Sequence, residues 1–415
     1  MKCIWIINQY ASTPDTGMAG RHYYLAQALA TRGYEVYLIT ATWHHLLRSG
    51  VAEPVSGVQD IDGVKLVRVQ TPRYEHAHDK RRILSWLIFA LGVTRLESSG
   101  CRRPDVVLCS SPSLVAFLGA EQVARRAKCR LVFEVRDIWP LTLVEIGGMS
   151  ARNPAVRLMQ WIEDRAYRIS DRVISTLPGA VEHMVSRGMD RRKFCWIPNG
   201  FSGAEVEAAE PLPVAVAARL PKDSFIVGYA GTLGAANAMD VFVDAAAILK
   251  DRPDIAFVMV GHGREEKDLQ SRALAQGLDN VHFLGPVPKV QVQSMLRHFD
   301  ACFVGSTKSA LYRFGTSPNK LFDYLVSGKP IIYGIDSPGY SPVSDFGAGL
   351  SVPPEDASAL AAAVLKLYAT SGKERLKMGA NGRRAAFEHH EYAMLAGRLE
   401  EVLFPDAGNP VRQSR

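Results

Sequence analysis

Short apolar segments alternate with segments of helical periodicity along the first half of the chain. Ile4–Ile7 is followed by a polar loop, and a helical pattern over Arg21–Thr31 stops at Gly33. The pattern predicts buried strands at Ile4–Ile7, Glu35–Thr40, Val64–Val69, Val106–Cys109, Leu131–Val135 and Val173–Ser175. Because helices separate these strands, we expect a parallel sheet with helices on both faces.

The same alternation restarts at Phe225–Tyr229. Further strands are predicted at Ile255–Val260, His282–Leu284, Ala301–Val304 and Pro330–Tyr333, and helices at Ala238–Lys250, Glu265–Gln276 and Ala357–Tyr368. The predicted fold class is therefore α/β, with two Rossmann-like, doubly wound parallel-sheet domains. Such sheets bind ligands beyond the carboxyl ends of their strands, so we expect the active site in a cleft between the domains.

Composition shifts suggest the domain boundaries. Residues 201–224 are rich in Ala, Glu and Pro and predict a linker. It would separate a first domain, 1–200, from a second domain, 225–384. Residues 385–415 would form a long final helix, over Ala385–Leu403, and a tail.

Composition excludes several classes. Apolar residues make up 47% of the 415 positions and charged residues 22%, so disorder, collagen and coiled coil are poor interpretations. The six cysteines lack zinc-ligand spacing and suit free thiols in a reducing compartment. The N-terminal segment predicts a strand, not a signal peptide, and no segment reaches the ~20 apolar residues of a membrane span. We expect a cytoplasmic protein.

The formal net charge of +7 is unevenly distributed. Residues 1–200 hold 27 Lys and Arg against 18 Asp and Glu, whereas residues 201–415 hold 22 against 24. The excess of positive charge in the first half favours binding to phosphates, nucleic acid or an anionic membrane. Without a recognised motif or clustered basic helix, nucleic acid is the poorest of these partners.

One segment suggests a membrane surface. Lys80, Arg81 and Arg82 run directly into an aromatic-rich apolar stretch that ends at Leu91. The pattern is typical of an interfacial helix, but also of a buried helix with a basic first turn. The scarcity of polar positions favours burial.

Several glycine-containing loops connect a strand to a helix, where backbone N–H groups can meet an anion. None has the dinucleotide spacing G-x-G-x-x-G. An ordinary loop remains the alternative for the first of them. The candidate residues are Gly17, Gly20 and Arg21 in the first half, and Gly231, Thr232, Gly234, Asn237 and Gly263 in the second.

The densest candidate site runs from Arg313 through Gly315 to Asp323. Ser317 or Asn319 could cap a helix there, leaving N–H donors free for a phosphate. Lys320 adds a positive charge, and Asp323 could accept from ribose hydroxyls. The alternative is a capped helix with a surface Lys–Asp pair.

Two charged pairs invite opposite interpretations. Arg136 and Asp137 follow a predicted strand, where an α/β sheet places functional groups, although a structural Arg–Asp pair is the alternative. Asp60 and Asp62 mimic a metal-binding D-x-D motif, but Asp62-Gly63 is a hairpin turn signal. We expect no metal there.

These segments together resemble the GT-B-fold glycosyltransferases of family 4, over about residues 2–404. The chain is most similar to the bacterial branch with fucosaminyltransferase-like enzymes of O-antigen and capsule assembly. The matching segments are Arg32–Val36, Glu134–Pro140, Ile197–Gly200, Gly228–Gly234, Gly261–Gly263, Phe283–Val287 and Phe314–Gly328.

The resemblance implies a nucleotide-sugar donor held mainly by the second domain, and no metal or other cofactor. Gly231–Asn237 and Ser317–Lys320 would surround the diphosphate, Val287 would meet the base and Asp323 the ribose. Gly17–Arg21 would close over the donor phosphate, and the last helix would cross back to the first domain.

The chain departs from the family pattern in three places. Thr232 and Asn237 stand where many members have a basic pair, so Lys320, Arg313, Arg21 or backbone donors must meet the phosphates. Gly315 replaces the first acid of the E-x7-E motif, whose second acid is Asp323. Arg136 replaces a frequent His.

The implied reaction is retaining sugar transfer, with Lys320 and Arg21 stabilising the leaving diphosphate and Asp137, beside Arg136, orienting sugar or acceptor. The donor would be a UDP-sugar, such as that of L-FucNAc. The acceptor would be a polyprenyl-diphosphate-linked saccharide, reached from an anionic inner-membrane surface. A GT-B sugar-nucleotide 2-epimerase and a non-catalytic nucleotide-binding scaffold are the alternatives.

Overall fold

The computed structural model describes residues 1–17, 20–48, 57–74, 79 and 81–405. The chain divides into two compact units. The first unit comprises Met1–Pro198 with Tyr392–Arg415, and the second comprises Asn199–Glu391. Each unit contains one twisted sheet with helices on both faces, as the alternation of apolar strands and helical segments predicts.

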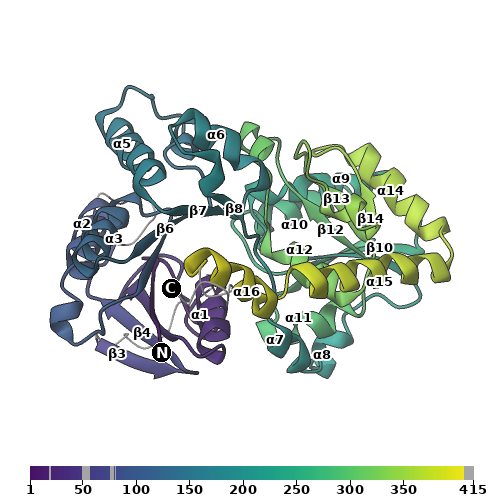
Figure 1. Cartoon of the computed structure of the whole chain (residues 1–415). Helices are drawn as coiled ribbons and strands as arrows, with labels where there is room; N and C mark the ends of the chain where they lie inside the picture. Colours follow the sequence, from purple (N-terminus) through teal and green to yellow (C-terminus); the bar gives the residue numbers. More distant parts are fainter. Residues whose placement is uncertain (18–19, 49–56, 75–78, 80, 406–415) are drawn as a thin grey trace. The chain divides into compact units, whose positions relative to one another are not determined.

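The sheet of the first unit has the order β3-β4-β2-β1-β5-β6-β7-β8 (Figure 1). Every pairing is parallel except that of β3 with β4. The central strand β1 is apolar and fully buried, since both faces of the sheet are covered there. The strands are β1 (Cys3–Ile7), β2 (Glu35–Ala41), β3 (Gly57–Ile61), β4 (Val64–Val69), β5 (Val106–Ser110), β6 (Arg130–Val135), β7 (Arg172–Ser175) and β8 (Phe194–Trp196).

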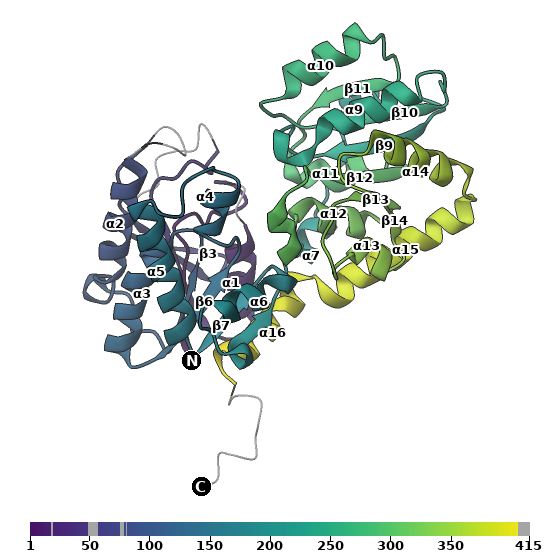
Figure 2. The same cartoon turned by 90° about the horizontal axis from the view of Figure 1, so that it is seen from above.

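Helices cover this sheet in two groups. Helix α3 packs against both α2 and α5, whereas α1 packs against α16 (Figure 2). This division follows from right-handed crossovers, because the chain moves outward from β1 in both directions. The helices are α1 (Arg21–Thr31), α2 (Arg81–Val93), α3 (Leu114–Ala127), α4 (Leu141–Glu145), α5 (Pro154–Ile169), α6 (Val181–Ser186) and α16 (Tyr392–Leu403), with short 3-10 turns at Glu97–Ser99, Pro178–Ala180 and Arg191–Lys193.

Helix α2 is only half buried, which differs from the buried helix that the sequence favoured. Its inner face packs Ser85, Phe89, Ala90 and Val93 against the unit. Four apolar side chains of the opposite face are about half exposed: Ile83, Leu84, Leu87 and Leu91. Lys80 lies outside the described residues. No helix of the described part of the chain is long and apolar enough to cross a bilayer.

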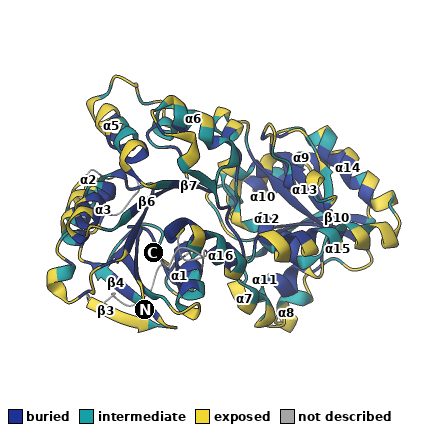
Figure 3. Ribbon diagram, viewed as in Figure 1, coloured by how far each residue is buried: buried dark blue, intermediate teal, exposed yellow. Residues whose placement is uncertain are grey.

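The β3–β4 hairpin confirms the interpretation of Asp60 and Asp62 as turn residues. Asp62 and Gly63 both have positive φ, at 52° and 79°, and Asp60 accepts a hydrogen bond from the Gly63 N–H. Asp62 accepts from the Tyr23 hydroxyl. Strand β3 forms the edge of the sheet, and most of it is exposed (Figure 3).

The sheet of the second unit has the order β11-β10-β9-β12-β13-β14, all parallel. Helix α9 packs against α14 and α10, and α12 packs against α15 and α11. The strands are β9 (Phe225–Ala230), β10 (Ile255–Val260), β11 (Val281–Gly285), β12 (Ala301–Gly305), β13 (Ile331–Gly334) and β14 (Gly349–Ser351). The helices are α9 (Met239–Ile248), α10 (Glu266–Ala275), α11 (Lys289–Leu296), α12 (Asn319–Ser327), α13 (Pro342–Asp345), α14 (Ala357–Ala369) and α15 (Gly372–His389), with 3-10 turns at Ala235–Asn237 and Ala310–Phe314.

The predicted linker and final helix differ from the structure in detail. Residues 201–224 contain two short helices, α7 (Gly203–Glu207) and α8 (Val214–Ala217), and belong to the second unit. The predicted single helix over 385–403 is two helices, α15 and α16. The break falls at His390, whose carbonyl accepts from the Phe201 N–H beside a strand-like bridge between Phe201 and Glu391. Helix α15 stays with the second unit, and α16 packs on the first.

Candidate functional site

The second unit has a topological switch point between β9 and β12. The chain leaves β9 toward β10 and β11, then returns to β12 and continues toward β13 and β14. Loops that follow the two central strands therefore diverge and leave space at their carboxyl ends, where doubly wound sheets bind ligands. The β9 loop, Gly231–Gly234, is one of the segments that the sequence predicted.

Two glycines let the β10 loop pack on the β9 loop. A Cβ atom on Gly261 would stand 1.9 Å from the Gly231 carbonyl oxygen, and one on Gly263 would stand 1.8 Å from the Leu233 oxygen. The Leu233 N–H in turn donates to the His262 carbonyl at 2.8 Å. Gly263 therefore holds the β9 loop in shape, which gives it a packing role. A Cβ atom on Gly234 would meet the Thr232 side chain at an ordinary contact distance of 3.7 Å.

Lys320 of α12 reaches this loop. Its Nζ donates to the Tyr229 hydroxyl at 2.8 Å and to the Asn237 side-chain oxygen, and lies 4.6 Å from the centre of the Tyr229 ring. Tyr229 and Asn237 both donate onward to the Thr232 carbonyl, at 2.7 and 2.9 Å. The structure thus brings together Lys320, Asn237 and Thr232, three of the residues predicted for the diphosphate.

Burial changes the acid–base behaviour of this lysine. Desolvation lowers the pKa of Lys320 to about 7. The surrounding partners are a phenol, an amide and a backbone carbonyl, none of which carries a negative charge at neutral pH. A cation without a counter-ion in a partly dry site favours an anionic ligand.

The N-terminus of α12 differs from the predicted capped helix. Pro318 occupies the N-cap position, and neither Ser317 nor Asn319 caps the helix. Ser317 is engaged elsewhere, because its hydroxyl accepts from the Asn199 N–H at 2.8 Å and its carbonyl accepts from the Asn199 side chain at 2.7 Å. Gly315 has a φ of 89°, so the turn before the helix requires a glycine.

Asp323 pairs with Lys289, not with Lys320. The Lys289 Nζ contacts both carboxylate oxygens, at 2.6 and 2.8 Å. Val287, in the loop between β11 and α11, is partly buried in the core. Arg313 is exposed, donates to the Ala310 carbonyl and lies over the Phe314 ring.

In the first unit, a buried carboxylate organises the ends of three elements. Glu134 of β6 accepts from the Arg21 guanidinium at 3.0 Å, His22 lies at 2.6 Å and the Ser110 hydroxyl donates at 2.6 Å. Burial alone would raise the pKa of Glu134, but the charges of Arg21 and His22 hold it well below its usual range. Burial lowers the pKa of His22.

Arg21 is engaged within the first unit. Its side chain is buried, and besides Glu134 it donates to the carbonyls of Ile197, at 2.9 Å, and Pro198. A guanidinium that turned to a leaving phosphate would give up its contacts with one buried carboxylate and two carbonyls. In the structure Arg21 therefore ties α1 to β6 and to the end of the unit.

Gly17 and Gly20 have packing reasons as well. A Cβ atom on Gly17 would stand 2.6 Å from the Ser12 hydroxyl and 2.9 Å from the Leu46 carbonyl oxygen. One on Gly20 would stand 2.7 Å from the Tyr24 ring, where that ring crosses the start of α1. The two residues between these glycines lie outside the described part.

Arg136 and Asp137 lie at the carboxyl end of β6, as predicted, and do not form a hydrogen-bonded pair in the described chain. The Asp137 side chain is exposed. The Arg136 N–H donates to the Ser111 hydroxyl at 2.9 Å. Among the described residues its buried Nε atom has no hydrogen-bond partner, so this guanidinium retains a donor for a ligand.

The structure adds an aromatic cluster that the sequence did not single out. Arg82 lies over the rings of Tyr10, Trp86 and Trp139, 5.2 to 5.9 Å from their centres. Arg82 and Trp86 both donate to the Tyr10 hydroxyl, at 3.1 and 2.6 Å. The sequence marked Arg82 and its aromatic-rich stretch, and separately the segment that leads to Trp139, but it did not predict that they meet at Tyr10.

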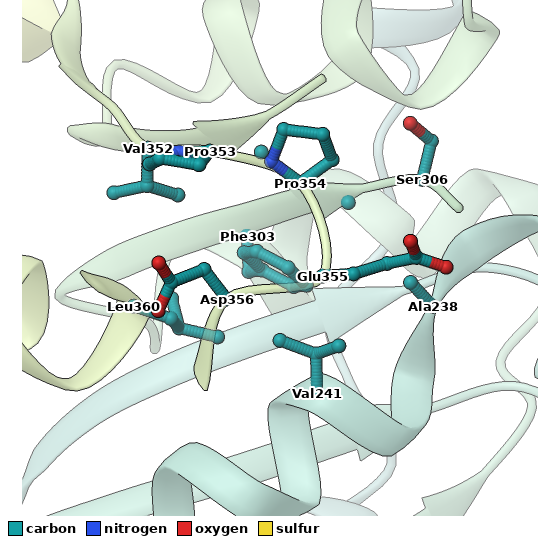
Figure 4. Close-up of a pocket in the computed structure, with 12 residues that line it drawn as sticks. Ala238, Val241, Phe303, Ser306, Val352, Pro353, Pro354, Glu355, Asp356 and Leu360 are labelled. Atoms are coloured by element: carbon teal, nitrogen blue, oxygen red, sulfur yellow. The ribbon is translucent and has the colours of Figure 1, made fainter. Parts of the chain in front are cut away.

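A tight hollow beside the start of α9 is not the ligand site. It has no room for a water molecule. Apolar side chains such as Val241, Phe303 and Leu360 fill it, and the Glu355 and Asp356 carboxylates point in different directions (Figure 4). Asp356 caps α14 by accepting from the Ala359 N–H. Within the described residues, no three His, Cys, Asp or Glu side chains gather as metal ligands would.

Two doubly wound units, one with a cation held at its switch point, define the GT-B class of fold. Solved structures agree. Sucrose-phosphate synthase from Thermosynechococcus elongatus superposes with a TM-score of 0.74 at 20% identity, over 98% of this chain and 100% of that one. Anabaena HepE in complex with UDP and glucose superposes at 0.68 and 15%, over 97% and 99%.

Sequence comparisons give the family. Residues 16–200 match the model "Glycosyl transferase 4-like domain", and residues 216–385 match "Glycosyl transferases group 1". The chain belongs to the GT-B glycosyltransferases.

Two curated relatives match at low identity. A putative colanic acid biosynthesis glycosyl transferase, WcaI of Escherichia coli K12, is 22% identical over 63% of this chain and 66% of its own length. A probable glycosyltransferase, WbjE of Pseudomonas aeruginosa, is 22% identical over 68% and 69%. The chain thus spans about two thirds of the length of these relatives.

Proposed function

We propose that the protein transfers a sugar from a nucleoside diphosphate, UDP by likeness to the ligand of HepE, to a saccharide acceptor. The observation that carries the proposal is the position of Lys320. Its ammonium lies on the β9 loop at the switch point, beside Tyr229 and Asn237, with no carboxylate among its hydrogen-bond partners there. A dianionic diphosphate is the ligand that such a site favours.

The chemistry follows from this placement. The bond between the anomeric carbon and the diphosphate oxygen breaks as the acceptor oxygen bonds to that carbon on the same face, which gives retention. The proton of the acceptor hydroxyl passes to the leaving diphosphate oxygen. Lys320 stabilises the charge that develops on the leaving diphosphate, with backbone N–H groups of the β9 loop. This electrostatic stabilisation requires no metal. Asp323 holds the ribose, and Val287 meets the base.

The first unit supplies the groups that meet the acceptor. Asp137 is exposed at the end of β6. Beside it, the buried Nε atom of Arg136 has no hydrogen-bond partner among the described residues. We assign Asp137 to orienting the sugar or acceptor, with Arg136 as its neighbour. Arg21 has no part in this proposal, because its guanidinium holds Glu134 and the end of the unit together.

The biological setting is surface polysaccharide assembly. WcaI is named for colanic acid biosynthesis, which supports a role in O-antigen or capsule formation. We propose an N-acetylated deoxyhexosamine such as L-FucNAc as the sugar, and a polyprenyl-diphosphate-linked saccharide as the acceptor. The surplus of 27 basic over 18 acidic residues in positions 1–200 supports work at the anionic inner face of the membrane.

A calorimetric titration with a panel of nucleotide sugars, followed by transfer assays with lipid-linked saccharides, tests the proposal. We expect one UDP-sugar to bind and to be consumed only when acceptor is present. Conversion of the donor without acceptor would indicate an epimerase. Tight UDP binding without any transfer would indicate a nucleotide-binding scaffold. Either result would overturn the transferase assignment.

A further inference from the structure

The exposed face of α2 is apolar where a surface helix is normally polar. Ile83, Leu84, Leu87 and Leu91 are 49–57% exposed and recur at spacings of three and four residues, so they form one stripe along the helix. The described helix contains no acidic residue. Water around four large aliphatic side chains on one stripe is costly, which marks the stripe as a contact surface.

A groove continues from the C-terminal end of this stripe. It lies between α2 and the exposed β3–β4 hairpin and has a volume of about 450 Å³. Its apolar wall includes Val58, Val69 and Ile88, and Leu91 belongs to both the stripe and the groove. Two arginines, Arg68 and Arg95, line it as well.

More cations surround the same end of α2. Arg126 of α3 donates to the Thr94 carbonyl at 2.9 Å, and Arg103 donates to the Arg126 carbonyl at 2.7 Å. Arg81 is exposed at the other end of the helix, whereas Arg82 is turned inward onto Tyr10 and Trp86. Among the described residues nearby, three are acidic: Asp79 caps the start of α2, Glu97 follows its end, and Asp60 lies on the exposed strand β3.

We propose that the α2 stripe and the adjoining groove dock on an anionic phospholipid surface. Ile83, Leu87 and Leu91 enter the acyl layer, the groove takes in part of a lipid chain, and Arg68 and Arg95 bind the lipid phosphate. The proposal rests on the proposed function, since it supplies the face through which the enzyme approaches a lipid-linked acceptor.

Charge selects this occupant over a second copy of the chain. Pairing two copies through α2 would place Arg68, Arg95 and Arg126 of one copy near the same residues of the other, and none of the residues that line the groove is acidic. An anionic bilayer offers acyl chains to the apolar stripe and negatively charged headgroups to the cations. The salt dependence of binding measures the contribution of the cations. The loss of binding on apolar substitution measures the contribution of the stripe.

Flotation of the full chain with vesicles tests the proposal. We expect binding to vesicles with phosphatidylglycerol and little binding to pure phosphatidylcholine. Replacing the stripe (Ile83→Gln, Leu87→Gln, Leu91→Gln) should lower the partition coefficient at least tenfold. Replacing the groove cations (Arg68→Gln, Arg95→Gln) should lower it at least fivefold and flatten its salt dependence.

The matched control variants replace other exposed residues of the first unit. Leu158→Gln changes a leucine of α5 that is 56% exposed, and the pair Arg191→Gln and Arg192→Gln removes the same charge from an exposed turn. Both controls should float like the wild type. Urea unfolding curves verify that each variant is folded.

Three results would overturn the docking proposal. They are equal flotation of the wild type and the stripe variant, equal binding to neutral and anionic vesicles, and a wild-type dimer in sedimentation that the stripe variant converts to a monomer without vesicle binding. If the protein floats with vesicles as expected but binds no nucleotide sugar, the docking proposal stands and the proposed function is wrong.

Discussion

The ammonium of Lys320 donates to the hydroxyl of Tyr229 across 91 positions of sequence, at 2.8 Å. This contact places a cation from α12 on the loop after β9, next to Asn237. Asn237 and Thr232 occupy positions where many family members are expected to carry basic residues. The chain therefore supplies the positive charge of this loop from a different helix.

Removing this cation should impair transfer more than folding. We expect Lys320→Met to reduce kcat/KM at least tenfold, because one charged hydrogen bond to a leaving phosphate is worth roughly 1.5–3 kcal/mol. Lys329→Met is the matched control, since Lys329 is a lysine of the same unit that donates to the Arg297 carbonyl. Transfer kinetics and a denaturation curve would separate the two effects. Near-normal turnover in Lys320→Met would contradict the leaving-group role.

The affinity for UDP-glucose should fall as the pH rises above neutrality. The pKa of Lys320 is about 7 in the free protein, and a bound diphosphate holds the lysine protonated. Binding then takes up a proton, so the affinity is largest below pH 7 and falls roughly tenfold between pH 7 and 8.5. Calorimetry in buffers of different ionisation enthalpy measures the uptake. Lys320→Arg should bind without uptake; uptake that persists in this variant would assign the proton to another group.

The ribose contact predicts a thermodynamic cycle. If Asp323 holds a ribose hydroxyl, wild-type protein should bind UDP more tightly than 2′-deoxy-UDP, by roughly tenfold for a charge-assisted hydrogen bond. Asp323→Asn should bring the two affinities close together. Lys289→Met removes the partner of Asp323 and should preserve the preference for ribose. An unchanged preference in Asp323→Asn would exclude the ribose contact.

Glu134 should be essential to stability and not to donor binding. Its replacement by Gln leaves the buried Arg21 charge without a counter-ion, which costs about 3–5 kcal/mol in the free energy of unfolding. Because the pKa of Glu134 is depressed, its contribution is present above the unfolded-state pKa and is lost as the pH falls through the folded-state value. Glu182→Gln breaks an exposed pair with Arg191 and should cost about 0.5 kcal/mol or less. Urea unfolding of both variants checks the difference.

Chelation should leave transfer intact, because Lys320 and the helix and loop N–H groups carry the charge of the leaving group. We expect the rate after EDTA treatment to remain within about twofold of the untreated rate, a difference smaller than 0.5 kcal/mol in barrier. Loss of activity that magnesium restores would show that a divalent ion shares this role.

The sequence by itself determined the two sheets, because period-two and continuous apolar runs are local signals that each strand carries alone. It also located the loops that follow β9 and β10, since Gly261 and Gly263 are required where two backbones come too close for a Cβ atom. Segment boundaries were less certain: the break at His390 depends on a contact with Phe201, which no local pattern reveals.

Only the tertiary structure decided which charges are free. The sequence made both Arg21 and Lys320 candidates for a phosphate contact, but Arg21 is buried against Glu134, while Lys320 meets neutral partners at the switch point. Likewise, the apolar run of α2 did not reveal which of its faces is packed. A side chain's availability depends on what distant segments place beside it, and that information is absent from any short stretch of sequence.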